Sequence, residues 1–323
     1  MVLNIIFFIA ACFALSWLSS HLIKTMVSIA KFLRWREFVV AFFVMAFAAS
    51  LPNFFVDINA AFKKIPQLAF GEVIGGNLVD LTVVMALAAL FSKKHLKAES
   101  NMVQTSAIFT AIIVVLPLFL VLDGSLDRID GLILIFSFVV YAWWLFSKKD
   151  RFKKIYREKY KKTEKNHQAF LKSILKIIVI LILLLAASWV VIDNAKLFSV
   201  KLGIPLSLVG ILIVGLGNSF PETYFSIISA RKGEAWMVLG DIMGSVIICS
   251  TLVLGVVALI SPFKIYDFSP FLIARAFTLI AALFFLISIK TEKMITKREG
   301  LILLFIYIIF LITEIFKPYL LSV

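Results

Sequence analysis

The chain has 323 residues, of which 62% are hydrophobic and 16% charged, and its formal net charge is +14. Soluble domains contain about 45–50% apolar residues, so this composition argues against a soluble globular protein and predicts an integral membrane protein. The positive charge would also fit nucleic-acid binding. However, Lys and Arg accumulate in the cytoplasmic loops of membrane proteins, and we expect no nucleic-acid partner. Cys12 and Cys249 each stand alone in an apolar segment, which argues against a disulfide framework or a zinc site.

Ten hydrophobic segments follow one another along the chain, each long enough to cross about 30 Å of hydrocarbon as a helix. They are residues 3–22, 37–62, 67–91, 103–122, 129–147, 170–192, 203–230, 235–260, 269–289 and 299–317. The first segment has no basic start and no small-residue cleavage motif, so we expect a membrane helix and not a removed signal peptide. The predicted fold class is all-α integral membrane, with five transmembrane helices in each half.

Basic residues alternate between the connections that join these spans. Of the 33 Lys and Arg residues, 25 fall in the odd-numbered connections and 8 in the even-numbered connections and the C-terminus. The positive-inside rule therefore predicts that both termini are extracellular and that the segment 148–169 is cytoplasmic. We predict a first five-helix repeat at 1–147, a basic linker at 148–169 and a second repeat at 170–323. The linker is interpreted as a solvated segment that fixes topology, although its charge would also suit an anionic lipid surface or a regulatory contact.

Residues 48–92 recur at residues 217–261 with a constant offset of 169 and no gap. Ser50 and Pro52 correspond in this way to Ser219 and Pro221. Such internal similarity indicates a duplication. Because each half has an odd number of spans, the second copy must cross the membrane in the opposite sense. Inverted repeats with broken helices at their interface are typical of secondary transporters, whose substrate and ion sites lie near the midplane.

Each copy begins with an apolar helix that meets a proline, in MAFAASLPNFF and in IVGLGNSFPETYF. Proline inside a helix removes a backbone hydrogen bond, and lipid offers no partner to the freed carbonyl groups. A cation is a good partner for them, although Ser50 or Ser219 could satisfy the backbone locally. Glu222 directly follows Pro221, and a carboxylate near mid-bilayer is costly enough to indicate a function. Its structural alternative is a protonated or serine-bonded Glu222 that locks helices together.

A glycine-containing helix follows each kink, in GEVIGGNLVDLT and in GDIMGSVIICST. Gly71 and Gly75 lie four residues apart on one helical face, as do Gly240 and Gly244, and this spacing permits close helix approach.

The same two helices carry polar side chains at helical spacing. Asp80 is expected near mid-span with Asn77 on the same face, and Ser245 and Cys249 are similarly related. The oxygen-bearing side chains of both kinks and both helices suit Ca²⁺ or Na⁺ and not a soft transition metal. The primary candidate ligands are Ser50, Asn53, Asn77, Asp80, Ser219, Glu222 and Ser245.

With these motifs the chain resembles the cation/Ca²⁺ exchanger superfamily, particularly prokaryotic Na⁺/Ca²⁺ exchangers. The family pattern is small-x-Ser-x-Pro-Glu, then Gly-Asn-x-x-Gly-Ser-Asn-x-x-Asn/Asp, and GNSFPE followed by GDIMGS is similar to it. The resemblance covers the whole ten-helix layout, but specific motifs only in the two repeats. It implies ion ligands at Ser50, Asn53, Gly76 (through its backbone), Asp80, Ser219, Glu222, Ser245 and the position of Cys249.

The chain departs from the family pattern at several of these positions. Asn53 stands in place of the family's glutamate and Gly76 in place of its serine, while Val246 and Cys249 stand where Asn and Asp or Asn are usual. Asp80 fills a position that is often asparagine. Two central carboxylates remain, Asp80 and Glu222, one from each half.

Four further residues are secondary candidates: Asp57, Glu72, Asp241 and Cys249. Asp57 lies one turn beyond Asn53, and Cys249 is interpreted as a small packing residue. Glu72 and Asp241 come earlier on their helices, so we expect vestibule charges, or alternatively carboxylates that cap a helix start.

Two central carboxylates balance one divalent ion, or two monovalent ions or protons. An uncompensated buried charge is heavily penalised, so ions should replace one another at such a site. The predicted function is therefore secondary-active antiport of Ca²⁺ against Na⁺ or H⁺, by alternating access through a midplane carboxylate site. Helices one and six, which lack buried charge, would slide past the rest.

We expect a monomer in the cell membrane, with inorganic cations and the lipid bilayer as its partners and no resident cofactor. Two alternatives stay open. One is a non-transporting relative with a sensing or structural role, which Asn53, Gly76 and Cys249 would favour. The other is an intramembrane aspartyl enzyme using Asp80 and Glu222, but without an HExxH motif or a histidine at membrane depth we predict that the chain is not an enzyme.

Overall fold

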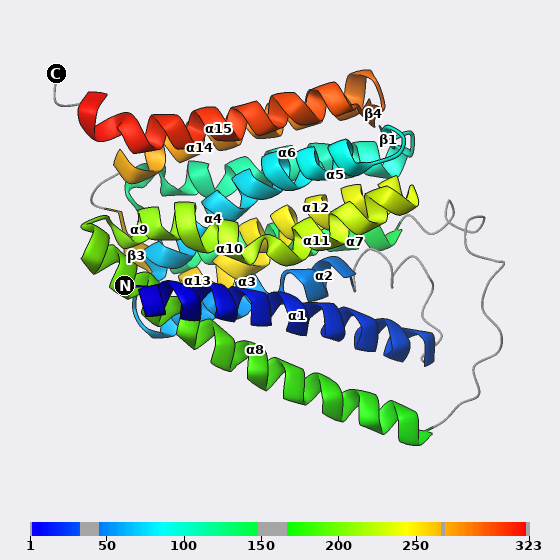
Figure 1. Ribbon diagram of the computed structural model, residues 1–323, viewed down its shortest axis with the longest axis horizontal. Helices are drawn as coiled ribbons and strands as arrows, with labels where there is room; N and C mark the ends of the chain where they lie inside the picture. Colours follow the sequence, from blue (N-terminus) through cyan, green and yellow to red (C-terminus); the bar gives the residue numbers. More distant parts are fainter. Residues whose placement is uncertain (1, 33–44, 148–166, 266–268, 321–323) are drawn as a thin grey trace.

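The computed structural model describes residues 2–32, 45–147, 167–265 and 269–320 as a bundle of long, roughly parallel and antiparallel helices (Figure 1). The first half contains α1 (Val2–Phe32), α2 (Met45–Ala49), α3 (Leu51–Phe62), α4 (Pro66–Val79), α5 (Met85–Phe91), α6 (Asn101–Leu120) and α7 (Arg128–Ser147). The second half contains α8 (His167–Leu202), α9 (Leu206–Val209), α10 (Gly215–Asn218), α11 (Phe220–Lys232), α12 (Ala235–Ile248), α13 (Leu254–Ile260), α14 (Ser269–Thr291) and α15 (Lys297–Leu320).

Within the described ranges, nine helical stretches are long and apolar enough to cross a membrane. They correspond to all the expected spans except the second, 37–62, of which only residues 45–62 are described, as α2 and α3. The stretches 66–91 and 235–260 are the most deeply buried. Peripheral helices such as α7, α8 and α15 expose many Leu, Ile and Phe side chains, as helices facing lipid do. The all-α membrane fold is therefore confirmed.

The predicted helix breaks occur at equivalent positions in the two halves. Ser50 separates α2 from α3, and Ser219 separates α10 from α11. Pro52 and Pro221 are the second residues of the helices that follow. Proline is tolerated in the first turn because that turn's N–H groups have no intrahelical partner. Each break thus places the polar residues of its motif at the start of a new helix.

The helices that follow the breaks share a second irregularity. A π-helical turn at Asp80–Val84 joins α4 to α5, and another at Cys249–Val253 joins α12 to α13. These ranges differ by the repeat offset. A third π-helical turn, Gly210–Val214, joins α9 to α10. Single π turns inside helices occur frequently at functional sites, and two of these three begin at candidate ligand positions.

Glycine allows α4 to cross the α9–α10 stretch at backbone contact. A Cβ atom added to Gly71 would lie 2.2 Å from the Ser207 carbonyl oxygen, and one added to Gly75 would lie 2.2 Å from that of Ile211. On the other side of the crossing, Gly215 lies against Gly76. A Cβ atom added to Gly215 would lie 2.7 Å from the backbone nitrogen of Gly76. The predicted role of Gly71 and Gly75 in close packing is confirmed. This crossing brings the second half's break next to α4.

Two short antiparallel strand pairs tie the halves together at opposite ends of the bundle (Figure 1). β1 (Leu96–Lys97) pairs with β4 (Met294–Ile295), and β2 (Ser125–Leu126) pairs with β3 (Phe263–Lys264). Each pair joins a strand of one half to a strand of the other, as expected for two inverted copies of one motif. Helix α1 lies along α8 at one edge of the bundle (Figure 1). These are the first helices of the two repeats, so the repeats place their first helices side by side.

Candidate cation site

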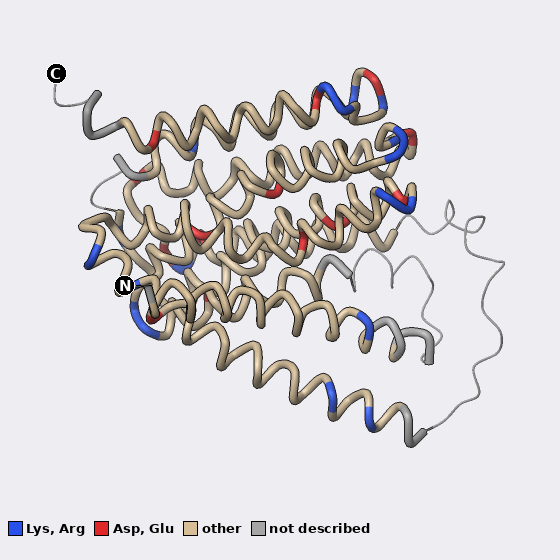
Figure 2. The backbone as a smooth tube through the Cα atoms, viewed as in Figure 1, with Lys and Arg blue, Asp and Glu red and all other residues tan. Residues whose placement is uncertain are grey.

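Charged side chains divide the bundle into two ends and an interior. Lys and Arg concentrate at the end where β1 and β4 lie, and fewer lie at the end where α1 begins (Figure 2). Asp and Glu residues also occur along the helices within the bundle (Figure 2). The fully or almost fully buried acidic residues of the duplicated segments 48–92 and 217–261 are Asp57, Glu72, Asp80, Glu222 and Asp241. The two described salt bridges, Lys63–Asp193 and Lys97–Glu99, involve none of them.

Asp80 and Glu222 come together from the two halves. Asp80 is the first residue of the π-helical turn after α4, and Glu222 lies in the first turn of α11. The Ser245 hydroxyl on α12 donates to Glu222 Oε1 at 3.4 Å and also lies beside the Asp80 carboxyl. Ser245 therefore links the two carboxyl groups. The positive end of the α11 helix dipole adds favourable potential at Glu222.

Ser219 completes this group at the helix break. Its hydroxyl lies beside the Asp80 carboxyl and donates to the Gly215 carbonyl oxygen at 3.1 Å. Asp80 Oδ1 and Glu222 Oε2 are buried and have no hydrogen-bond partner among the described residues. The four predicted ligands Asp80, Glu222, Ser219 and Ser245, which we call the central site, thus converge with unsatisfied carboxylate oxygens.

The positions that the repeat offset relates to Asp80 and Glu222 form an uncharged pair. Asn53 on α3 corresponds to Glu222, and Cys249 to Asp80. The Asn53 Nδ2 donates to Cys249 Sγ at 3.6 Å, while Asn53 Oδ1 is buried without a hydrogen-bond partner among the described residues. Cys249 therefore touches a candidate ligand in addition to packing in its helix.

The remaining primary candidates lie around these two pairs. Ser50 is buried at the break before α3. Asn77 on α4 donates through Nδ2 to Ser250 Oγ at 2.8 Å, so its amide is held by the π-helical turn of the other half. Ser250 was not predicted, since nothing in the sequence distinguishes it from other small residues of that helix.

The structure contradicts the expected place of two secondary candidates. Glu72 and Asp241 were expected in vestibules or at helix starts, but Glu72 is 0% and Asp241 4% exposed, and each is the seventh residue of its helix. The prediction assumed that a residue near the start of its helix lies near the surface of the protein. In fact α10 packs over α4 at this level, and Asn218 Nδ2 donates to Glu72 Oε1 at 2.9 Å.

Asp57 and Asp241 each lie beside a residue from the neighbouring helix of the same repeat. The Asp57 carboxyl is within hydrogen-bonding distance of the Glu72 carboxyl, and the Asp241 carboxyl lies beside Ser226. Ser226 occupies the position that corresponds to Asp57. Sequence reasoning missed both Asn218 and Ser226, although applying the repeat offset to Asp57 would have identified Ser226.

The chemistry of the central site is that of hard-cation binding. Among the described residues, no group of three or more His, Cys, Asp and Glu side chains is arranged to hold a metal ion. The central site instead offers two carboxylates, hydroxyl groups and the backbone of a helix break. Oxygen ligands of this kind suit Ca²⁺ or Na⁺.

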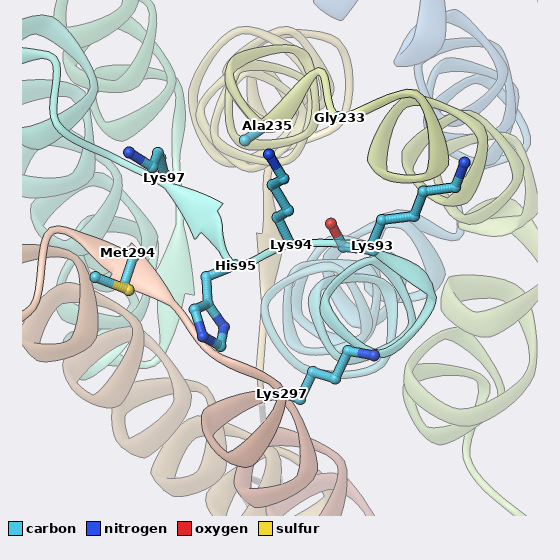
Figure 3. Close-up of a pocket in the computed structure, with 9 residues that line it drawn as sticks. Lys93, Lys94, His95, Lys97, Gly233, Ala235, Met294 and Lys297 are labelled. Carbon is cyan, nitrogen blue, oxygen red and sulfur yellow. The ribbon is translucent and has the colours of Figure 1, made fainter.

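A separate pocket of about 500 Å³ lies at the end of the bundle that carries β1 and β4. It is lined by Lys93, Lys94, His95, Lys97 and Lys297, together with four uncharged residues. The lysine side chains point in different directions and their ammonium groups do not meet (Figure 3). Its charge is unsuited to a cation, and this geometry gives no single point for an anion. The pocket is part of the basic end of the bundle.

Comparison with known proteins relates both halves to one family. Residues 3–147 and 172–316 each match the family described as sodium/calcium exchanger protein. A curated relative, the sodium/calcium exchanger MaX1 of Methanosarcina acetivorans, is 23% identical over 91% of this chain and 93% of its own length. The inner membrane protein YrbG of Escherichia coli is 26% identical over 70% of each chain.

The fold is also similar to a solved structure. The sodium-calcium exchanger NCX_Mj, soaked with Na⁺ and Sr²⁺, superposes with a TM-score of 0.67 over 95% of this chain and 97% of that chain, at 24% sequence identity. At that identity the likeness establishes the arrangement of the helices. The two-repeat membrane architecture expected from the sequence is therefore confirmed.

Proposed function

Because the chain belongs to the sodium/calcium exchanger family, we propose that it is a secondary-active cation antiporter that exchanges Ca²⁺ for Na⁺ or H⁺ at the central site. The observation that carries this proposal is the pairing of Asp80 with Glu222. One carboxylate comes from each inverted repeat, both are buried, and Ser245 lies beside both.

The charge of this carboxylate pair supports the exchange of one cation for another and not the release of a cation from an empty site. Among the described residues, neither buried carboxylate has a salt-bridge partner, and two such carboxylates strongly disfavour an empty site. One Ca²⁺ neutralises them, and so do two Na⁺ or two H⁺. Departure of one cation is then coupled to arrival of the other, and only ion-loaded forms cross between inward-facing and outward-facing states.

The position of α1 and α8 supports a route for alternating access. These two long helices pack against each other at one edge of the bundle (Figure 1), and the described part of neither carries a buried Asp, Glu, Lys or Arg. Their movement past the breaks at Ser50 and Ser219 would expose the central site to one side and then the other without moving a charge through lipid.

Ion flux in sealed proteoliposomes tests the antiport. Vesicles with purified protein are loaded with Na⁺ and diluted into Na⁺-free buffer with radioactive Ca²⁺, and a parallel set carries an outward proton gradient. We expect one of the two gradients to drive Ca²⁺ uptake, because the outgoing cation frees the central carboxylates. An ionophore that dissipates that gradient should stop the uptake. Uptake equal to that of protein-free vesicles under both gradients would contradict the proposal.

The positive-inside rule extends the proposal to topology. Lys94 lies at the basic end of the bundle and Lys201 near the end of α8, and both are exposed. In intact cells we expect Lys201→Cys to react with a membrane-impermeant maleimide and Lys94→Cys to react only after permeabilisation. The native Cys12 and Cys249 are buried and should remain silent. The reverse labelling pattern would show that the orientation is inverted.

A further inference from the structure

A second group of buried polar side chains lies outside the central site. Asp57 on α3 and Glu72 on α4 are both 0% exposed, and their carboxyl groups are within hydrogen-bonding distance of each other. Asn218 at the end of α10 donates to Glu72 Oε1 at 2.9 Å. Residues from three helices and from both halves of the chain thus meet at this point.

This group is distinct from the central site along the helix. Asp80 follows Glu72 by eight residues on the same helical stretch, which corresponds to about 12 Å of helix axis. Asn218 directly precedes Ser219, so the break between α10 and α11 contributes one side chain to each group.

Most oxygens of the second group have neither a donor nor a compensating charge among the described residues. Within the described part of the chain, Asp57 Oδ1, Asp57 Oδ2, Glu72 Oε2 and Asn218 Oδ1 are buried without a hydrogen-bond partner. Neither carboxyl group takes part in the described salt bridges. Two carboxylates at this distance repel each other, and burial removes the water that would weaken the repulsion. A cation between them reduces both penalties.

The identity of the oxygens decides which cation fits. A single shared proton would bridge one oxygen of each carboxyl group, but it would leave the Asn218 oxygen and the other Asp57 oxygen unsatisfied. A metal ion can be coordinated by all of them. Ca²⁺ takes about six to eight oxygens, whereas the unpartnered side-chain oxygens here number four, so the lower coordination demand of Na⁺ matches better. One Na⁺ together with one proton on the carboxyl pair balances its two negative charges.

We propose that Asp57, Glu72 and Asn218 form a second cation site that binds Na⁺, separate from the Asp80–Glu222 pair. Only the role of this second site rests on the proposed antiport: it would bind a coupling ion beside the central site. The other half has no equivalent, because Ser226 and Asp241 supply a single carboxylate at the corresponding place. The pair of carboxyl groups in this site is therefore present in the first repeat alone.

Thermal stability of the purified wild-type protein separates the two sites. In saturating Ca²⁺, which occupies the central site, replacing choline chloride by NaCl is expected to raise the melting temperature further, because a ligand that binds only the folded state stabilises it. The double variant Asp57→Asn/Glu72→Gln should lose this Na⁺-dependent rise and keep the Ca²⁺-dependent one. Asn218→Ala should raise the Na⁺ concentration for half-maximal effect about five- to tenfold.

The matched control is Asp193→Asn/Glu99→Gln, which makes the same chemical changes in the two surface salt bridges and should keep both responses. Folding of the double variant has its own readout. In Na⁺-free and Ca²⁺-free buffer it should melt at a higher temperature than the wild type, since two uncompensated buried charges have been removed.

Two results would overturn the second site: a wild-type protein without a Na⁺-dependent rise, or an unchanged rise in the Asp57→Asn/Glu72→Gln variant. Failure of the proposed antiport gives a different result, namely no Ca²⁺-dependent rise in the wild type, and the Na⁺ response remains readable in that case.

Discussion

Glu222→Gln is expected to abolish Ca²⁺ exchange in proteoliposomes and to weaken Ca²⁺ binding roughly 100- to 5,000-fold. The substitution keeps the shape of the side chain but leaves Asp80 alone to balance a divalent ion. Removing one partner of a buried charge pair costs about 3–5 kcal/mol, and each 1.4 kcal/mol corresponds to about a factor of ten in affinity. Asp80→Asn should have an effect of the same order, measured by radioactive Ca²⁺ binding and by flux.

Two controls separate charge loss from general damage. Glu234→Gln makes the same chemical change at the residue before α12, away from the central site, and should leave Ca²⁺ binding unchanged. Asn53→Ala alters the position equivalent to Glu222 but removes no charge. Its expected cost is that of one hydrogen bond, about 1 kcal/mol or roughly fivefold. Wild-type affinity in both Glu222→Gln and Asp80→Asn would remove the central site from the account.

Gly75→Ala is expected to lower the melting temperature of the purified protein, whereas Gly76→Ala should not. Alanine at position 75 places Cβ 2.2 Å from the Ile211 carbonyl oxygen, and backbone cannot rotate away. Overpacking of this kind costs about 1–3 kcal/mol or more. Because the same crossing positions Ser219 and Asn218, Ca²⁺ affinity should fall as well.

Gly76→Ala is the matched control from the next position of the same helix. The nearest atom to its added Cβ is Glu72 Oε1 at 3.7 Å, an ordinary contact. Alanine in a helix interior is favoured over glycine by about 0.5–1 kcal/mol, so this variant should melt at the wild-type temperature or above it. Equal melting temperatures for the two variants would show that the α4 crossing is looser than the structure indicates.

The repeat offset made much of this fold predictable from the sequence. It related Ser50 to Ser219 and Pro52 to Pro221, and the helices break at both serines. An odd number of spans per half required inversion, and the strand pairs that join the halves at opposite ends agree with it. These features follow from the repeated motif and from the odd number of spans in each half, and both can be read from a single sequence.

Contacts between helices were less predictable. Asp57 and Glu72 are separated by a turn and lie on different helices, so their meeting depends on how α3 packs on α4. The burial of Glu72 depends on α10, which approaches only because Gly71, Gly75 and Gly215 have no side chain. The glycine spacing indicated a close approach but not which helix approaches, and the vestibule prediction was wrong for that reason.

The two copies are equivalent in backbone and different in their carboxyl groups. Glu222 and Asp80 supply two carboxyl groups where Asn53 and Cys249 supply none. Asp57 and Glu72 supply two where Ser226 and Asp241 supply one. In the proposed mechanism, the duplicated backbone accounts for alternating access, and the unequal side chains account for which ions bind and where.

Anomalous scattering from crystals soaked with Sr²⁺ tests the central claim most directly, because Sr²⁺ is a heavier analogue of Ca²⁺ with oxygen ligands. The account predicts one strong peak between the carboxyl groups of Asp80 and Glu222, within coordination distance of Ser219 or Ser245, which disappears in Glu222→Gln crystals. A peak elsewhere in the bundle with none between these carboxyl groups would contradict the assignment of the central site.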